Sequence, residues 1–312
     1  MSKIKLAIVG YGNMGKIHYK AVEKNNFCDD PLVVELDKDK VDGGIQSVNF
    51  DEFVESYLDK IDGAIISSPS SVHLNNTLPL IAKNIPLLVE KPLTSSKSDD
   101  NELLDSAIKK GIIFKCGLIE LYNPIIQELS EIDFENVNFV HIKRHSPKTD
   151  ITRKLENIIL DLTLHDISII YKIFKPKKVE IMAVDLSKEN GVAESAQILL
   201  KLDEKFSVFI SSSRQDQEKV RMLEIFDEKS VYHCDLKNKF YEVKQGGKID
   251  SVDAKSITES NVLKKVDMLN KPETAEIQLE SFVQSIKNNE IDEEHLNIVK
   301  NTHELAYKLL DS

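Results

Sequence analysis

The sequence predicts an α/β fold with a doubly wound parallel sheet, followed by a second α+β domain built on a mainly antiparallel sheet. Over residues 1–120, short apolar strand signals alternate with helix signals, which is the pattern of parallel α/β proteins. Between Val137 and Val243, apolar residues instead recur at every second position, which is typical of antiparallel strands. A length of 312 residues suits two domains, so we expect one at residues 1–121 and one at residues 122–312.

In the first domain, strands and helices are expected to alternate along the chain. Strands are predicted at residues 6–9, 32–36, 63–66, 86–89 and 112–116. Helices are predicted after the glycine turn through Lys24 and at residues 51–58, 72–83 and 96–110. The last of these helices has the clearest ends. Ser96 and Asp99 fit a capping box at its start, and Gly111 is suited to close its last turn.

In the second domain, one helix interrupts the predicted strands. Apolar alternation is clearest in Ala196–Leu202 and Phe206–Ile210, and a charged turn separates these two runs. The interrupting helix is expected around residues 155–174. Near the end of the chain, residues 279, 282, 283 and 286 are apolar at helical spacing, and a last helix is expected to run through Leu310.

Composition excludes several classes of protein. Hydrophobic residues at 41% and charged residues at 30% are ordinary for a globular protein and argue against a disordered or fibrous chain. A net charge of −11 disfavours nucleic-acid binding, and no apolar run approaches the roughly 18 residues of a membrane span. Residues 1–3 lead straight into strand-like sequence, so we expect no signal peptide. The three cysteines lack metal or disulfide spacing, so we expect reduced thiols, no metal and a cytoplasmic location.

A glycine-rich motif follows the first predicted strand and opens a helix. It reads Gly10-Tyr11-Gly12-Asn13-Met14-Gly15. The first glycine permits a tight turn, the second lets a pyrophosphate approach the backbone, and the third allows close helix–strand packing. Asp37, at the end of the second strand, would bind ribose hydroxyls and repel a 2′-phosphate. The motif predicts a dinucleotide site that prefers NAD, with NADP as the alternative because Lys38 and Lys40 follow the acid.

Two further motifs carry groups suited to acid–base chemistry. Glu90-Lys91-Pro92 follows a predicted strand at the sheet edge where ligands bind, so Lys91 is either a rigid contact to a substrate oxygen or a plain turn lysine. Asp161 and His165 are four residues apart in an apolar helical stretch and therefore share a face. The two side chains form either a reactive site or a pair that meets its hydrogen-bonding needs within the helix. Asp166 is expected to be solvated.

In this order and spacing, the motifs resemble those of the Gfo/Idh/MocA oxidoreductase family. The resemblance runs almost end to end and rests on residues 10–15, Asp37, Ser68-Pro69 with His73, Glu90-Lys91-Pro92, Asp161 with His165, and residues 272–282. Gly117-Leu118-Ile119-Glu120-Leu121-Tyr122-Asn123-Pro124 is similar to a stretch of nucleotide-sugar dehydrogenases, such as those resembling UDP-N-acetylglucosamine 3-dehydrogenases. There, Leu118 and Leu121 replace polar residues. Asn157 stands where glycine is common, and asparagine tolerates a left-handed turn.

The resemblance implies a Rossmann domain and a second domain whose large open-faced sheet forms oligomer contacts. It implies an NAD(P)-dependent dehydrogenase acting on a CH–OH group of a sugar, in a homodimer or homotetramer. His165 would be the base, Lys91 would stabilise the alkoxide, and Asp161 would orient the sugar or the imidazole. The residues implied for the cofactor are Gly10, Gly12, Asn13, Met14, Gly15, Asp37, Ser68, Pro69, His73, Glu90 and Lys91.

The substrate is expected to be a nucleotide-linked sugar. The predicted substrate contacts are Tyr122, Asn123, Arg144, Arg153 and Arg214. The arginines are included because a guanidinium binds phosphates or carboxylates through a planar fork, and because arginine is rare in this lysine-rich chain. A free polyol such as an inositol is the alternative. So is a non-catalytic NAD-sensing regulator, a role that one fungal member of the family has. Of the other histidines, His18 is expected to pack against or brace the glycine loop, whereas His295 and His303 are expected at the surface or in a sheet.

Overall fold

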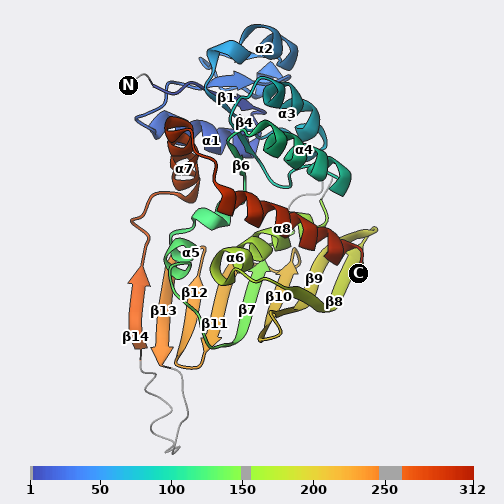
Figure 1. The fold of residues 1–312 in the computed structure, drawn as a ribbon, viewed down its shortest axis with the longest axis vertical. Helices are drawn as coiled ribbons and strands as arrows, with labels where there is room; N and C mark the ends of the chain where they lie inside the picture. The colour runs from blue at the N-terminus through green and yellow to red at the C-terminus, as the bar shows by residue number, and fades with distance from the viewer. Residues whose placement is uncertain (1–2, 149–155, 246–261) are drawn as a thin grey trace, which may run out of the picture. The chain divides into compact units, whose positions relative to one another are not determined.

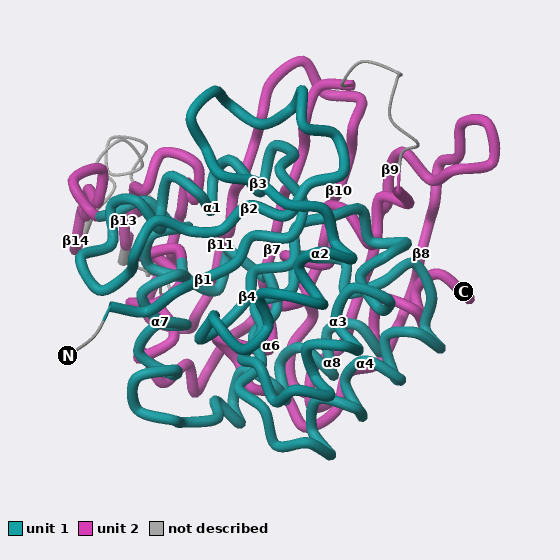
Figure 2. Tube along the Cα trace, turned by 90° about the horizontal axis from the view of Figure 1, so that it is seen from above, with its two compact units in different colours: residues 1–122, 272–304 teal, residues 123–271, 305–312 magenta. Residues whose placement is uncertain are grey.

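The chain forms two compact units. The computed structural model describes residues 3–148, 156–245 and 262–312. One unit consists of Met1–Tyr122 and Pro272–Glu304, and the other of Asn123–Lys271 and Leu305–Ser312; Figure 2 colours them separately. The single domain boundary predicted from the sequence lies after residue 121. The contacts place that boundary one residue later and return a late segment of the chain to the first unit.

The first unit contains a six-stranded parallel sheet in the order β3-β2-β1-β4-β5-β6 (Figure 1). Its strands are β1 Leu6–Val9, β2 Leu32–Val34, β3 Ser47–Val48, β4 Gly63–Ile66, β5 Leu87–Val89 and β6 Phe114–Cys116. The strand order reverses between β1 and β4, and ligands of such sheets bind at the carboxyl ends of the strands beside this reversal. The short β3 was not expected, and β2 ends two residues earlier than the pattern suggested.

The helices of the first unit agree with the predicted alternation. They are α1 Asn13–Lys24, α2 Phe50–Ser56, α3 His73–Ala82, α4 Lys97–Lys110 and α7 Thr274–Asn288, with 3-10 turns at Lys38–Lys40, Leu58–Lys60, Ser70–Val72 and Ile119–Tyr122. At the ends of α4, the predicted Gly111 stop is confirmed, and of the predicted capping box the structure shows the hydrogen bond to the Ser96 side chain. The Ser96 hydroxyl accepts a hydrogen bond from the Asp99 N–H, and Gly111 closes the helix in the left-handed conformation.

Helix α7 belongs to the first unit because its apolar face completes the core there. Leu279, Phe282 and Val283 are buried in one cluster with Leu6 and Ile8 of β1. At the polar rim, Lys24 and Asn25 at the end of α1 bond Glu276 and Glu280 of α7. These contacts join residues about 250 positions apart in the sequence. Sequence periodicity predicts such a helix but not which core it completes.

The second unit contains an eight-stranded sheet in the order β14-β13-β12-β11-β7-β10-β9-β8. Its strands are β7 Val137–His145, β8 Val179–Glu189, β9 Val192–Leu202, β10 Phe206–Ser213, β11 Val220–Asp227, β12 Ser230–Asp235, β13 Phe240–Gln245 and β14 Val262–Asp267. The predicted, mainly antiparallel sheet is confirmed. However, β7 lies between β11 and β10 and runs parallel to β10, so the strands do not form a simple meander.

One face of this sheet is buried and the other is open. Helices α5 Pro124–Leu129 and α6 Leu164–Phe174 cover one face (Figure 1), and the final helix α8 spans Glu293–Leu310. Val140, Ile142, Ile198, Leu200, Val208, Ile210, Leu223 and Ile225 are buried. Alternate residues of the same strands, such as Phe139, Leu199 and Phe209, remain partly exposed. This alternation is what period-two patterning predicts for a sheet packed on one side.

Substitution of Phe282 tests the role of α7 in the first core. Phe282 is 0% exposed, so Phe282→Ala should lower the free energy of unfolding by about 3–5 kcal/mol through lost burial and a cavity. Ile17 on α1 is 44% exposed, and Ile17→Ala should cost within about 0.5 kcal/mol. Urea denaturation measures both. Equal effects would contradict the assignment of α7 to this core.

Candidate active site

The predicted motifs of the first unit gather at the carboxyl ends of its strands. The glycine loop follows β1, Ser67-Ser68-Pro69 follows β4, Glu90-Lys91 follows β5, and Gly117 follows β6. Backbone bonds hold these ends together, since the Ser67 N–H donates to the Val9 carbonyl and the Gly117 N–H to the Val89 carbonyl. The loops therefore share the edge where dinucleotides bind in sheets of this strand order.

The three glycines of the loop have different roles. Gly10 has φ +95°, and a Cβ there would lie 2.5 Å from the Ser68 nitrogen. A Cβ on Gly15 would lie 2.2 Å from the Gly10 carbonyl oxygen, so both positions require close backbone packing. Gly12 has nothing within 4 Å of a Cβ. The missing side chain there leaves room for a ligand to approach the backbone.

The start of α1 fits a pyrophosphate. Gly12 is the N-cap, no side chain caps the helix, and the first turn contains no acidic residue. Asn13 is exposed and Met14 half-buried in that turn. Backbone N–H groups and the positive end of the helix dipole are therefore available to an anion. When bound, NAD would be held here by Gly12, Asn13 and Met14.

Glu35 is a residue that the sequence analysis missed. Its carboxylate accepts hydrogen bonds from the Tyr11 N–H (2.8 Å) and the Asp37 N–H (3.1 Å), and so ties the glycine loop to the end of β2. Asp37 is exposed, caps the following 3-10 turn and lies 3.5 Å from the Lys40 ammonium. The sequence did contain a signal for Glu35, because it is an acidic residue at the end of the same predicted strand, two positions before Asp37. The two carboxylates favour NAD, whereas Lys40 is engaged with Asp37.

Tyr11 projects from the loop toward a second carboxylate. Its hydroxyl donates to Asp42 (3.2 Å), and Lys16 pairs with the same aspartate (3.0 Å). Burial and the neighbouring Asp42 raise the pKa of Tyr11 to about 12, so the phenol remains protonated and continues to donate. This pair fixes the residue between Gly10 and Gly12.

His73 braces two of the loops. Its buried ring lies with Nε2 2.7 Å from the Ser68 carbonyl and Nδ1 2.9 Å from the Leu93 carbonyl. Asn76 donates to the Ser68 hydroxyl (3.0 Å), and Pro69 is exposed beside it. Both ring nitrogens are engaged by backbone, which favours a positioning role for His73 over direct cofactor contact.

Glu90 is buried behind Lys91. One carboxylate oxygen lies 2.7 Å from His18 Nε2 and the other accepts the Lys91 N–H (3.2 Å). A Cβ on Gly117 would come within 2.5 Å of the carboxylate, so only glycine leaves space for it. His18 is thus the partner of Glu90 as well as a packing residue of α1. Lys91 itself is half-buried, and its peptide bond to Pro92 is cis.

In the second unit, Asp161 and His165 lie on a helical stretch, but its first part is not an α-helix. Ile159–Thr163 is π-helical, with the Leu164 N–H donating to the Ile159 carbonyl, and α6 begins at Leu164. Such segments are rare and are frequent at functional sites. The His165 residue is 8% exposed and the Asp161 side chain 36%. Sequence spacing predicted the helix but carried no signal for its wider turn.

Asn157 constrains the start of this helical stretch through hydrogen bonds of its side chain and its carbonyl. Its side-chain oxygen accepts the Ile159 N–H (3.0 Å), and its carbonyl accepts the Asp161 N–H (3.0 Å). Asn157 does not have the positive φ suggested by comparison with glycine. An asparagine side chain that mimics a turn supplies the constraint instead.

The predicted arginine contacts have internal partners. The Arg144 guanidinium is 2.6 Å from Asp166, and both residues are buried. The expectation that Asp166 is solvated was therefore wrong, because a neighbouring strand provides its counterion. Arg214 pairs with Asp161 and Glu194. Arg153 lies outside the described residues.

Tyr122 and Asn123 are also engaged internally. Tyr122 is 6% exposed, with its ring 6.3 Å from that of His295. Asn123 caps α5 by accepting the Ile125 N–H and donates to the Leu236 carbonyl. These partners favour structural roles over the substrate contacts predicted. His295 is likewise buried and accepts the Cys116 N–H, and His303 is 2% exposed, so neither lies at the surface.

Other site types find little support in the part of the chain that the structure describes. No group of three or more His, Cys, Asp or Glu there could hold a metal. Nor does any described helix have the length and apolarity to cross a bilayer. The three cysteines are free and buried, and burial raises the pKa of the Cys28 thiol to about 11.

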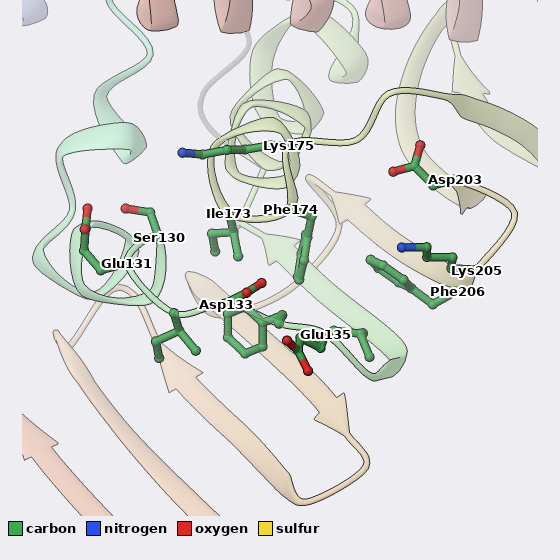
Figure 3. A pocket seen from close by; sticks show the side chains of 13 residues that line it. Ser130, Glu131, Asp133, Glu135, Ile173, Phe174, Lys175, Asp203, Lys205 and Phe206 are labelled. Carbon is green, nitrogen blue, oxygen red and sulfur yellow. The ribbon is translucent and has the colours of Figure 1, made fainter.

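A cavity of about 580 Å³ opens in the second unit between the end of α6, the start of β7 and the β9–β10 turn (Figure 3). Phe134, Phe174 and Phe206 lie along it, with ring centroids 5.3–5.7 Å apart in successive pairs. None of the predicted site residues lines it. It is therefore separate from the candidate active site.

Known proteins share the fold and part of the sequence. The chain is 22% identical over 234 residues to a UDP-N-acetylglucosamine 3-dehydrogenase of Acidithiobacillus ferrooxidans, covering 72% of each sequence. An inositol 2-dehydrogenase of Arthrobacter sp. is 21% identical over 207 residues, or 62% of this chain and 60% of the relative. A solved structure of the Acidithiobacillus enzyme superimposes with a TM-score of 0.81 over 99% of this chain and 97% of that one, at 17% identity.

Residues 4–118 match the Gfo/Idh/MocA family, described as an oxidoreductase family with an NAD-binding Rossmann fold. This match lies within the first unit. The predicted resemblance, fold class, NAD cofactor and dehydrogenase class are thereby confirmed. The individual site residues remain predictions.

Two glycine variants separate cofactor binding from folding. Gly12→Ala meets open space in the protein, so it should fold normally but weaken NADH binding by at least about tenfold, or about 1.4 kcal/mol, because the methyl group occupies the pyrophosphate position. Gly15→Ala collides with the Gly10 carbonyl and should lower the thermal midpoint. NADH fluorescence titration and thermal unfolding measure the two effects. Unchanged NADH affinity in Gly12→Ala would place the cofactor elsewhere.

Proposed function

We propose that this protein oxidises a ring secondary alcohol of a sugar, with a nucleotide-linked sugar as the favoured substrate. The observation that carries the proposal is the combination of a dinucleotide loop with Lys91 at the end of β5 and with Asp161 and His165 on α6 and the turn before it. Relatives named as sugar and inositol dehydrogenases support this substrate class.

Each residue has one task in the proposed reaction. His165 accepts the hydroxyl proton as general base, and the Lys91 ammonium stabilises the alkoxide as it forms. Asp161 orients the imidazole and stabilises the charge that His165 gains. The carbon-bound hydrogen leaves as hydride, for which the nicotinamide of bound NAD is the acceptor. A carbonyl replaces the alcohol, so atoms and charge balance.

The choice between a nucleotide sugar and a free polyol depends on how an anion would be held. Arg144 and Arg214 are engaged with carboxylates, which argues against a pyrophosphate contact by either of them, and Arg153 lies outside the described residues. An inositol dehydrogenase among the relatives supports the polyol alternative. A pyrophosphate contact weakens with ionic strength and a polyol contact does not, so the salt dependence of KM distinguishes the two.

We also propose that the protein is a cytoplasmic homo-oligomer. Free, buried cysteines are typical of a reducing compartment. The open face of the eight-stranded sheet exposes parts of Phe139, Leu199 and Phe209, which a second copy would cover in a homodimer or homotetramer. Sedimentation of the full chain measures the state.

Alanine variants of the two proposed catalytic residues test the activity. Lys91→Ala and His165→Ala should each lower kcat by at least about 100-fold, because each removes a group that acts in the transition state. Lys97→Ala, an exposed lysine at the start of α4, is the matched control and should turn over like the wild type. UDP-N-acetylglucosamine and myo-inositol are the substrates, with reduced-nicotinamide absorbance as the readout.

NADH titration of the same variants shows whether they remain folded. Turnover of Lys91→Ala and His165→Ala within about tenfold of wild type would contradict the assignment. NADH binding without turnover of either sugar, even in the wild type, would favour the regulator.

A further inference from the structure

Arg214 lies directly after β10 and faces the π-helical turn that carries Asp161. Its Nε and Nη2 atoms are 3.2 and 2.9 Å from the same oxygen, Oδ2 of Asp161. Nη1 is 3.3 Å from the Glu194 carboxylate, and the Arg214 N–H donates to the Glu194 carbonyl (3.0 Å). Nη2 also donates to the carbonyl of Glu156, just before the turn. One side chain therefore connects two carboxylates and the backbone.

Burial makes these bonds strong and specific. The side chains of Arg214 and Glu194 are each 4% exposed, whereas that of Asp161 is 36% exposed. Hydrogen bonds between charged groups are about twice as strong as neutral ones, and a guanidinium presents several donors in a fixed plane. Glu194 fixes that plane from the buried side. The partly exposed carboxylate of Asp161 is thus held by a guanidinium that is itself buried.

A second contact ties the same turn to the same strand. The Thr163 hydroxyl donates to the Ser212 hydroxyl (2.8 Å), and both residues are fully buried. Residues 161 and 163 of the π-helical segment are thereby paired with residues 214 and 212 of the β10 end. This arrangement holds the widened turn in register against the sheet, and Arg214 is its charged member.

We propose that Arg214 is a positioning residue that orients the Asp161 carboxylate for its work with His165, and that Glu194 holds Arg214 in place. This inference rests on the proposed function, since it gives Asp161 a support. It also replaces the prediction that Arg214 grips a substrate anion. An incoming phosphate would have to displace two carboxylates from a buried guanidinium, which leaves buried charge unpaired.

The test is a double-mutant cycle between positions 214 and 161. Arg214→Lys keeps the charge and removes the planar fork, Asp161→Asn removes the carboxylate, and the double variant combines them. Arg214→Lys should lower kcat by about 10- to 100-fold with the sugar KM within about threefold, as expected for a supporting residue. In the Asp161→Asn background, Arg214→Lys should not lower kcat further, because the carboxylate that Arg214 orients is absent.

Matched controls separate positioning from general damage. Arg221→Lys makes the same substitution on β11 and should keep wild-type activity. Glu194→Gln should lower kcat as Arg214→Lys does, but by a smaller factor. It should also cause no further loss of kcat in the Asp161→Asn background. Thermal unfolding shows that each variant is folded.

A second readout does not depend on substrate. Imidazole NMR follows the titration midpoint of His165 in the full chain, with the signal identified by its loss in His165→Gln. Asp161→Asn should lower the midpoint, because a neighbouring carboxylate favours the imidazolium. Arg214→Lys conserves charge, so it should shift the midpoint toward the Asp161→Asn value only by releasing the carboxylate. Neither substitution replaces a residue of the pairs Arg144–Asp166 and His145–Asp216.

The outcomes separate this inference from the proposed function. The positioning role is supported if Arg214→Lys causes no further loss of kcat in the Asp161→Asn background and by itself lowers the titration midpoint of His165. Additive losses with a raised sugar KM overturn it in favour of an anion contact. An unmoved midpoint also overturns it. Wild-type activity in Asp161→Asn itself contradicts the proposed function, whereas the NMR cycle still decides whether Arg214 positions Asp161.

Discussion

The close approach of three backbone segments at the end of β1 is the constraint on which the first unit depends. Gly15 lies against the Gly10 carbonyl, and Gly10 lies against Ser68, at distances that leave no room for a Cβ. This contact seats α1 directly on the sheet edge. Because α1 is so close, His18 reaches Glu90 at the end of β5. The close packing of the dinucleotide loop thus also positions His18 against Glu90, the residue directly before Lys91.

A hydrogen-bonded or ion-paired partner supports each group to which we assign chemistry, or its immediate neighbour in the chain. Glu90 beside Lys91 is paired with His18, Asp161 with Arg214, and Asp166, next to His165, with Arg144. A buried charge without a partner is costly, so each pair strongly restricts where its members can lie. Reactive groups held in this way need little reorganisation when charge develops. Such support also explains why polar residues occur in otherwise apolar segments such as 158–167.

Local signals predicted local structure well. The glycine spacing, the Ser96 cap and the Gly111 stop each depend on residues within one or two turns, and the structure places all of them as expected. Contacts distant in sequence could not be predicted. The role of α7 in the first core, the parallel entry of β7 and the Arg214–Asp161 pair each join segments that only the folded chain brings together.

The candidate site was predicted in outline but not in its supports. The motif residues at the strand ends follow from spacing, whereas Glu35 was missed because an acid two positions later fitted the motif equally well. Arginines were interpreted as ligand contacts because sequence shows their rarity and not their partners. The spacing of residues carried no signal for the π-helical turn, at which Asn157, Thr163 and Arg214 form hydrogen bonds.

A single-turnover experiment tests the central claim most directly. Protein and NAD in stoichiometric amounts are mixed with UDP-N-acetylglucosamine, and reduced-nicotinamide absorbance is followed, so that a cofactor retained between turnovers does not hide the reaction. We expect a burst close to one equivalent of reduced nicotinamide that is absent in Lys91→Ala. No burst with either UDP-N-acetylglucosamine or myo-inositol, in protein shown to bind NAD, would contradict it.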